Sequence, residues 1–232
     1  MIKKGLWLTL FAIAFALVES SVVVYLRALY YSDGFEFPLQ LIPRETLRIE
    51  LFREAATMVL LLSVAWLAGR HFYSRLSWFL IAFGIWDIFY YVWLKILLDW
   101  PSSFWSWDLL FLIPLPWVAP VLSPLLVSAT FIACGVGILY LEAGGREVRI
   151  GVFEWGLLFA GIGLIFVTYI HDYAVMLYSS QGCRFTALLE CDAFISRSAA
   201  YVPAVYNWTL FWFGELLIAT GAYRTVKKIA QG

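Results

Sequence analysis

Long apolar stretches recur along the whole of this chain, and each is about as long as a membrane-spanning helix. A helix of about 20 residues crosses roughly 30 Å of hydrocarbon. Because the stretches follow one another with short connections, a polytopic membrane protein is expected rather than a soluble domain with one anchor. We therefore predict an all-α integral membrane protein with a single transmembrane domain over residues 1–232.

Six of these stretches are expected to form a bundle of transmembrane helices, with boundaries accurate to a few residues. The predicted spans run from about Leu6 to Arg27, Ile49 to Gly69, Trp78 to Leu98, Val118 to Leu141, Val152 to Tyr178 and Tyr206 to Tyr223.

The composition supports this fold class and narrows the function. Of the 232 residues, 63% are hydrophobic and only 14% are charged, which is too few to cover the surface of a soluble domain. The formal net charge is zero, so no strong field attracts nucleic acid. We expect the partners to be the lipid bilayer and either other membrane subunits or further copies of this chain.

The distribution of Lys and Arg predicts the orientation. One side of the predicted bundle collects nine basic residues and the other collects four, and the richer side is expected to be cytoplasmic. This places both termini in the cytoplasm, in a multi-pass protein of the inner (cytoplasmic) membrane. The first set is Lys3, Lys4, Arg70, Arg75, Arg146, Arg149, Arg224, Lys227 and Lys228, and the second is Arg44, Arg48, Arg184 and Arg197.

Three features on the outer side are expected to be structured. Residues 43–56 mix charges with Leu and Ile at helical spacing, which predicts an interfacial helix running into the second span. Residues 100–120 hold four Trp and several Pro residues, so this segment is expected to lie along the interface without regular helix. Cys183 and Cys191 share an outer loop in an oxidising compartment, which predicts a disulfide.

The fifth span contains a group of small residues that predicts close helix packing. Gly156 and Ala160 form a small-xxx-small pair, and Gly161 and Gly163 follow.

Ionisable residues interrupt five of the predicted spans. Each ionised side chain costs about 2.5–3.5 kcal/mol at the bilayer centre, so the group needs compensation. Counting the helical rise from the outer face places four of them about 6–10 Å deep and two about 15 Å deep. The shallower four are Glu19, Glu54, His171 and Asp172, and the deeper two are Asp87 and Glu215. A shared cavity opening outward is predicted.

This residue set indicates a candidate metal site. Carboxylates with one imidazole suit a divalent metal such as Fe, Mn, Zn or Ca. The expected ligands are Glu19, Glu54, Asp87, His171 and Asp172, and the expected catalytic residues are Asp87 and Glu215.

A structural interpretation of the same residues stays open. Arg27, Arg53 and Lys95 lie near the outer ends of the first three spans and are placed to form packing ion pairs with Glu19, Glu54 and Asp87.

The first functional hypothesis is a membrane-embedded enzyme acting on a lipophilic or small substrate. The alternatives are a proton- or ion-coupled transporter and a structural subunit of a larger membrane complex. No nucleotide-binding loop or hydrolase motif is present in the sequence to choose among them.

Overall fold

A computed structural model of the protein describes residues 2–31, 34–180, 183 and 191–231. It is mostly helical, and five of its helices, α1 to α5, are long and apolar enough to cross a membrane. The helices are α1 (Ile2–Tyr30), α2 (Arg44–Ala68), α3 (Phe72–Leu98), α4 (Leu122–Ala143), α5 (Val152–Ser179), α6 (Asp192–Ala199) and α7 (Trp208–Gln231).

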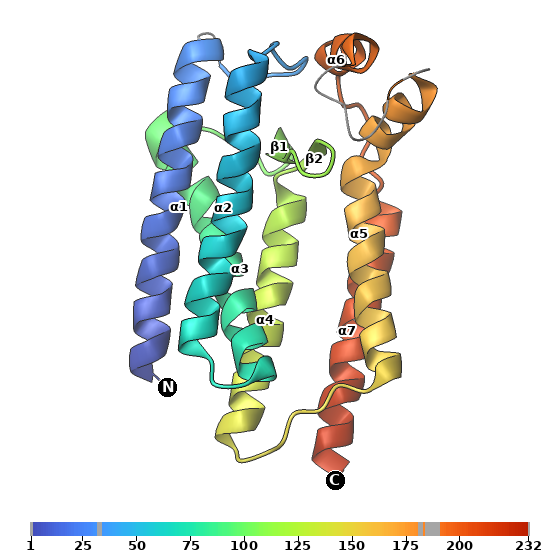
Figure 1. Ribbon diagram of the computed structural model, residues 1–232. Helices are drawn as coiled ribbons and strands as arrows, with labels where there is room; N and C mark the ends of the chain where they lie inside the picture. Colours follow the sequence, from blue (N-terminus) through green and yellow to red (C-terminus); the bar gives the residue numbers. More distant parts are fainter. Residues whose placement is uncertain (1, 32–33, 181–182, 184–190, 232) are drawn as a thin grey trace.

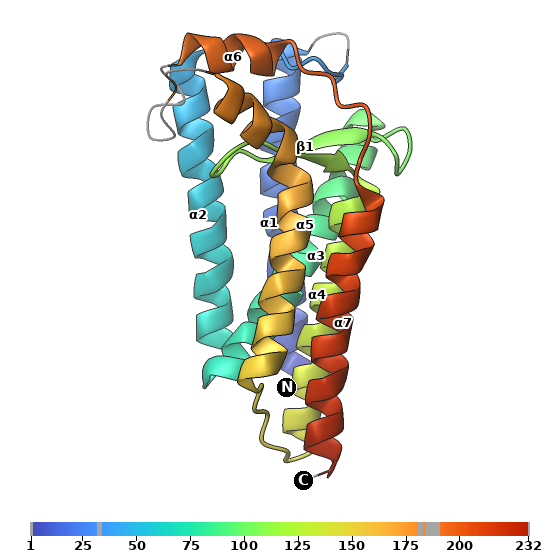
Figure 2. The same cartoon turned by 90° about the vertical axis from the view of Figure 1, so that its right-hand side faces the viewer.

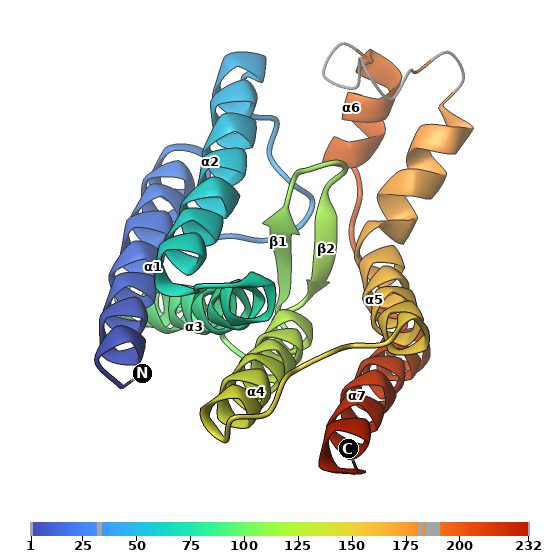
Figure 3. The same cartoon turned by 60° about the horizontal axis from the view of Figure 1, so that its bottom comes forward.

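The long helices run alternately up and down, so both ends of the chain lie at the same end of the bundle (Figure 1). Below, this is called the terminal end, and the opposite one the capped end. Helix α3 packs against α1, α2 and α4, while α5 pairs with α7. Seen from the terminal end, α1 to α4 form one side of the molecule and α5 with α7 form the other (Figure 3).

The Trp- and Pro-rich segment folds as a β-hairpin. Strands β1 (Trp107–Phe111) and β2 (Trp117–Pro120) pair antiparallel, with Asp108 opposite Ala119. Strand β2 packs against α4 and α5, so the hairpin links the two sides of the bundle. The absence of helix from residues 107–117 was expected from the prolines, but the strand pairing was not. The fourth span was predicted to begin at Val118, whereas residues 118–120 lie in β2 and α4 begins at Leu122.

The capped end also departs from the predicted outline. The segment 43–56 was predicted to be an interfacial helix running into the second span, and residues 44–56 do form the first half of the continuous helix α2. Helix α6 was not predicted, and it lies across the end of the bundle (Figure 2). Arg184, which was counted in the orientation argument, lies outside the described residues.

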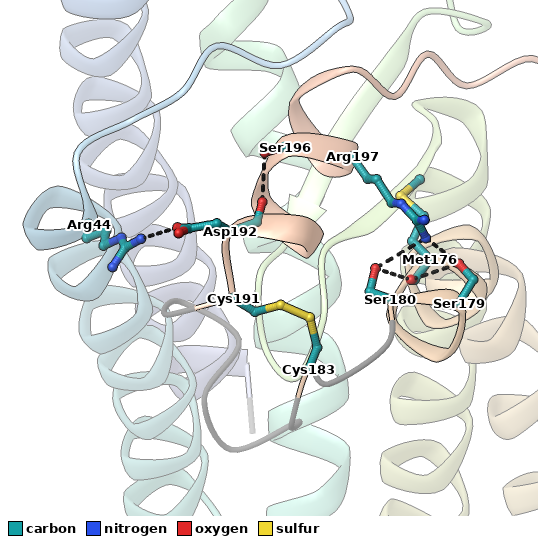
Figure 4. Close-up of a disulfide and its surroundings, with 9 residues drawn as sticks. All are labelled: Arg44, Met176, Ser179, Ser180, Cys183, Cys191, Asp192, Ser196 and Arg197. Carbon is teal, nitrogen blue, oxygen red and sulfur yellow. Dashed lines mark hydrogen bonds and ion pairs between the residues drawn. A yellow bond between two sulfur atoms is a disulfide. The ribbon is translucent and has the colours of Figure 1, made fainter.

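The predicted disulfide between Cys183 and Cys191 is confirmed (Figure 4). It leads directly into α6, whose Asp192 forms an ion pair with Arg44 at the start of α2, at an N–O distance of 2.6 Å. Arg197 at the other end of α6 donates to the hydroxyl of Ser179. These contacts hold α6 over the end of the bundle.

Glycine contacts explain the close pairing of α5 and α7. A Cβ atom on Gly161 would lie 2.6 Å from the carbonyl oxygen of Gly214, and one on Gly214 would lie 2.8 Å from the carbonyl oxygen of Gly161. Gly156 and Gly163 were expected to share this packing face, but a Cβ atom on either would meet no described atom within 4 Å. Of Gly156, Gly161 and Gly163, only Gly161 therefore lies in the close contact between α5 and α7.

Charged side chains join neighbouring helices at the terminal end. Glu154 at the start of α5 is fully buried, and its carboxylate accepts hydrogen bonds from Arg224 and Lys228 of α7 at 3.1 and 2.9 Å. Lys4 of α1 donates to the carbonyl oxygen of Ala68 at the end of α2. The bundle is thus tied together by polar contacts at the level where several predicted cytoplasmic basic residues lie.

Candidate membrane cavity

A cavity of about 1500 Å³ lies between the two sides of the bundle. Its wall includes residues from all seven helices and from the β-hairpin. Towards the capped end it is lined by Phe194 and Ile195 of α6. In the other direction it reaches Phe79 of α3, Ile162 of α5 and Ile218 of α7. Most lining side chains are apolar, so the cavity suits a lipophilic molecule.

Glu19 belongs to a charge network in the cavity wall. Its carboxylate forms an ion pair with Arg53 and accepts a hydrogen bond from the Thr57 hydroxyl at 2.5 Å. Arg53 also binds the Glu50 carboxylate, at N–O distances of 2.7 and 2.8 Å. One guanidinium therefore serves two buried carboxylates, and the Arg53–Glu19 contact matches the structural ion-pair interpretation.

Glu54 and Asp87 also line the cavity, but their partners are neutral. The Glu54 carboxylate accepts the backbone N–H of Leu112, at 2.9 and 3.1 Å. Asp87 accepts the hydroxyl hydrogen of Ser128 at 2.7 Å. Among the described residues, neither carboxylate has a basic side chain within ion-pair distance. Each can take up or release a proton without breaking an ion pair.

Arg27 and Asp108 form a second charged pair in the wall. Both are buried, and the guanidinium lies 3.6 Å from the carboxylate. Asp108 also accepts the hydroxyl hydrogen of Tyr91 at 3.0 Å. Burial raises the pKa of the Asp108 carboxyl to about 6, and the Arg27 charge and the Tyr91 hydrogen bond partly oppose this rise.

The other candidate residues lie away from the cavity wall. The Glu215 carboxylate accepts the hydroxyl hydrogen of Thr130 at 2.9 Å, between α7 and α4. His171 and Asp172 contact each other at 2.8 Å, with side chains 65% and 46% exposed. Asp172 also accepts the hydroxyl hydrogen of Tyr201. The cavity thus brings together Glu19, Glu54 and Asp87 but none of these three.

The cavity includes three of the five predicted metal ligands, and His171 and Asp172 do not line it. No group of three His, Cys, Asp or Glu side chains placed to hold a metal ion is found in the part of the chain that the structure describes. The set Glu19, Glu54, Asp87, His171 and Asp172 therefore stays a prediction as a metal site. Lys95, which was considered as a partner for Asp87, instead pairs with Asp99 at 2.7 Å.

Sequence reasoning missed the lining residue Asp108 and also Ser128, which donates a hydrogen bond to the lining residue Asp87. Asp108 was not singled out because it lies in a segment with no helical register, where depth and facing direction cannot be counted. Ser128 gave no signal because a hydroxyl in a helix usually bonds its own backbone. A charged residue within the apolar run WSWDLLF was the one available hint of a buried Asp108.

Comparison with known proteins adds no assignment to this geometry. No family model, curated protein or solved structure matches the chain. The cavity itself can enclose an apolar chain and present it with carboxylates and guanidinium groups.

Proposed function

We propose that this protein is a membrane-embedded enzyme that binds a lipophilic substrate in the cavity between its two sides. The observation that carries the proposal is the composition of the cavity wall. The wall of a largely apolar cavity of about 1500 Å³ includes Glu19, Glu54 and Asp87 from three different helices. Ionisable groups inside a membrane domain are costly, so they are a functional-site hypothesis by default.

Asp87 and Glu54 are assigned as the acid–base groups. General acid–base catalysis requires a side chain that exchanges a proton at the reacting atom. Glu19 is less suited because Arg53 holds its carboxylate in an ion pair. Asp87 and Glu54 each accept hydrogen bonds only from neutral donors in the described chain. The Ser128 hydroxyl fixes the direction of the Asp87 carboxylate from the neighbouring helix.

The proposal includes a specific membrane topology. Helix α7, at 24 residues, is long enough for a sixth span and pairs with α5 along the bundle. With six spans, the terminal end is cytoplasmic in an inner membrane and the capped end faces outward. Helix α6 and the start of α2 then lie at the outer interface, and the cavity lies towards the outer leaflet.

The test is a search for lipid turnover by the purified protein. The full chain would be reconstituted in liposomes made from a bacterial lipid extract, and the lipids compared by mass spectrometry before and after incubation. We expect one lipid class to be consumed, with loss of at least about 100-fold in rate in Asp87→Asn, the lower end of the contribution that a single acid–base group typically makes. Glu54→Gln is expected to show a smaller loss.

Two further variants make the result interpretable. Glu147 is exposed in the loop at the terminal end, and Glu147→Gln is expected to keep full turnover. Glu215→Gln distinguishes the assignment of Asp87 and Glu54 from the sequence-based prediction that Asp87 and Glu215 are the catalytic residues. Only the second assignment requires the turnover rate to fall in this variant. Absence of any lipid change with the folded wild type would reject the enzyme proposal. The transporter, complex-subunit and divalent-metal alternatives remain predictions.

A further inference from the structure

The most unusual cation in the cavity wall is Arg27. Its residue surface is 7% exposed, yet none of its N–H groups makes a hydrogen bond with the part of the chain that the structure describes. The guanidinium carbon lies 4.3 Å from the ring centre of Phe35 and 3.9 Å from that of Trp100. A guanidinium has five N–H donors, and ring contacts satisfy none of them.

The contact between Arg27 and Asp108 leaves this donor capacity largely unused. At 3.6 Å the two groups attract each other but are too far apart for a hydrogen bond. The Asp108 oxygen that does accept a hydrogen bond takes it from Tyr91, at 3.0 Å. A buried guanidinium normally binds carboxylate or phosphate oxygens through paired N–H groups. Arg27 therefore has donors available beside the cavity.

The wall also holds other donors without partners. Trp86 and Trp117 line the cavity, and their indole N–H groups, which can only donate, have no acceptor among the described residues. The hydroxyl groups of Tyr173 and Ser198, also lining residues, are likewise without partners. Buried donors without acceptors are rare in folded proteins. An occupant rich in acceptor oxygens matches this wall better than one rich in donors.

A second arginine lies at a similar depth. Arg48 lines the cavity from α2 and makes no ion pair with the described residues. Arg27 is three residues from the end of α1 and Arg48 is four residues after the start of α2, both at the capped end. The helical rise places them roughly 5 and 6 Å from that end of their helices. Apolar wall continues beyond them to Phe79 and Ile218.

We propose that the cavity binds an amphiphile with an anionic headgroup, the head held by Arg27 with Arg48 and the acyl or prenyl chain lying along the apolar wall. This inference names the class of substrate for the proposed function. It rests on the proposed function only in taking the cavity as the binding site. A lipid phosphate is the source favoured by the geometry, because Arg27 and Arg48 line the capped end of a cavity whose wall continues beyond them as apolar side chains.

Binding would be measured with dodecyl phosphate and the purified full chain in an uncharged detergent, without any reaction. Dodecanol has the same chain without the charge, and inorganic phosphate has the charge without the chain. Because a hydrogen bond to a charged group contributes substantially, dodecyl phosphate is expected to bind roughly ten- to a hundredfold more tightly than dodecanol. Inorganic phosphate at the same concentration is expected to show no saturable binding.

The decisive variants change the charge beside the head. Asp108→Asn removes the carboxylate that competes for Arg27, so the proposal expects tighter binding of dodecyl phosphate. The double variant Arg27→Gln/Asp108→Asn keeps a neutral pair in the wall, which protects the fold, and it should lose the preference for phosphate over dodecanol. Arg149→Gln, in the loop at the terminal end, is the matched control and should bind as the wild type does.

Several results would overturn the inference. These are equal affinity for dodecyl phosphate and dodecanol in the wild type, an unchanged preference in the double variant, or tighter binding of dodecyltrimethylammonium than of dodecyl phosphate. Asp87→Asn separates this site from the acid–base proposal. If that variant and the wild type bind dodecyl phosphate equally and neither turns over any lipid, the headgroup site stands and the enzyme proposal fails.

Discussion

Buried carboxylates in the cavity wall differ in what compensates them. Glu19 shares Arg53 with Glu50, whereas Glu54 and Asp87 accept hydrogen bonds from an amide and a hydroxyl. Removing one member of a buried ion pair leaves its partner uncompensated, which costs more than removing both. The single arginine of the Glu19 network is therefore its critical member.

Replacing Arg53 with Met is expected to destabilise the protein by roughly 3 kcal/mol, because Glu19 and Glu50 lose their cation. The double variant Glu19→Gln/Arg53→Met should recover part of this loss. Thermal and denaturant unfolding in detergent would measure both. A double variant no more stable than Arg53→Met would show that the ion pair is not the source of the effect.

A pH-dependent contribution is expected from Asp108 of β1. Its pKa in the folded protein is raised to about 6 from an ordinary value of 3.8, so folding favours the protonated carboxyl. The corresponding stability is fully present below pH 3.8 and is lost as the pH rises through about 6. Infrared spectra should show a protonated carboxyl band that disappears near pH 6 and is absent in Asp108→Asn. A band lost below pH 4 would contradict the assignment.

At the scale of helices, glycine positions decide which pairs approach closely. The backbones of α5 and α7 approach closely at Gly161 and Gly214, because neither residue has a side chain that would separate them. Gly84 does the same between α3 and α4, where a Cβ atom would lie 2.6 Å from the carbonyl oxygen of Ser128. This contact also brings Ser128 to Asp87, and thus helps to build the cavity wall.

Gly161→Ala and Gly214→Ala are each expected to push α5 and α7 apart, and to lower the unfolding midpoint by several degrees. Overpacking of this kind costs roughly 1–3 kcal/mol. Gly163→Ala is the matched control on the same helix, since a Cβ atom there meets no described atom within 4 Å. Equal effects at positions 161 and 163 would mean that helix propensity, not packing, dominates.

At the scale of the whole molecule, the arrangement places both termini at one end and the hairpin with α6 at the other (Figures 1 and 2). The terminal end carries Lys4, Arg224 and Lys228 in polar contacts. The positive-inside rule predicts that this end faces the cytoplasm.

Reporter fusions would test the proposed topology. An enzyme reporter that is active only in the cytoplasm should work when fused after Gly232 and when inserted at Glu147. It should be inactive when inserted at Ser103, in the connection before the hairpin. Activity at Ser103 with inactivity at Gly232 would invert the orientation, and a split between Gly232 and Glu147 would reject α7 as a sixth span.

The sequence by itself determined the long helices, but not the short helix α6. Hydrophobic length is a local property, because a bilayer requires about 20 apolar residues wherever a chain crosses it. The stretches predicted for the first five spans therefore correspond to α1 to α5 within a few residues, apart from earlier starts of α1, α2 and α3. The Cys183–Cys191 bridge was likewise accessible from spacing and compartment.

Only the tertiary structure decided which ionisable residues share a cavity. Depth follows from counting residues, but the direction in which a side chain points depends on how each helix is rotated against its neighbours. Glu215 was expected at the same depth as Asp87, yet its carboxylate contacts Thr130 and does not line the cavity. Asp108 lines the cavity from a strand that the sequence pattern did not predict. The pairing of Arg53 with Glu19, and of Arg27 with Asp108, depends on residues brought together from distant segments, which no local pattern records.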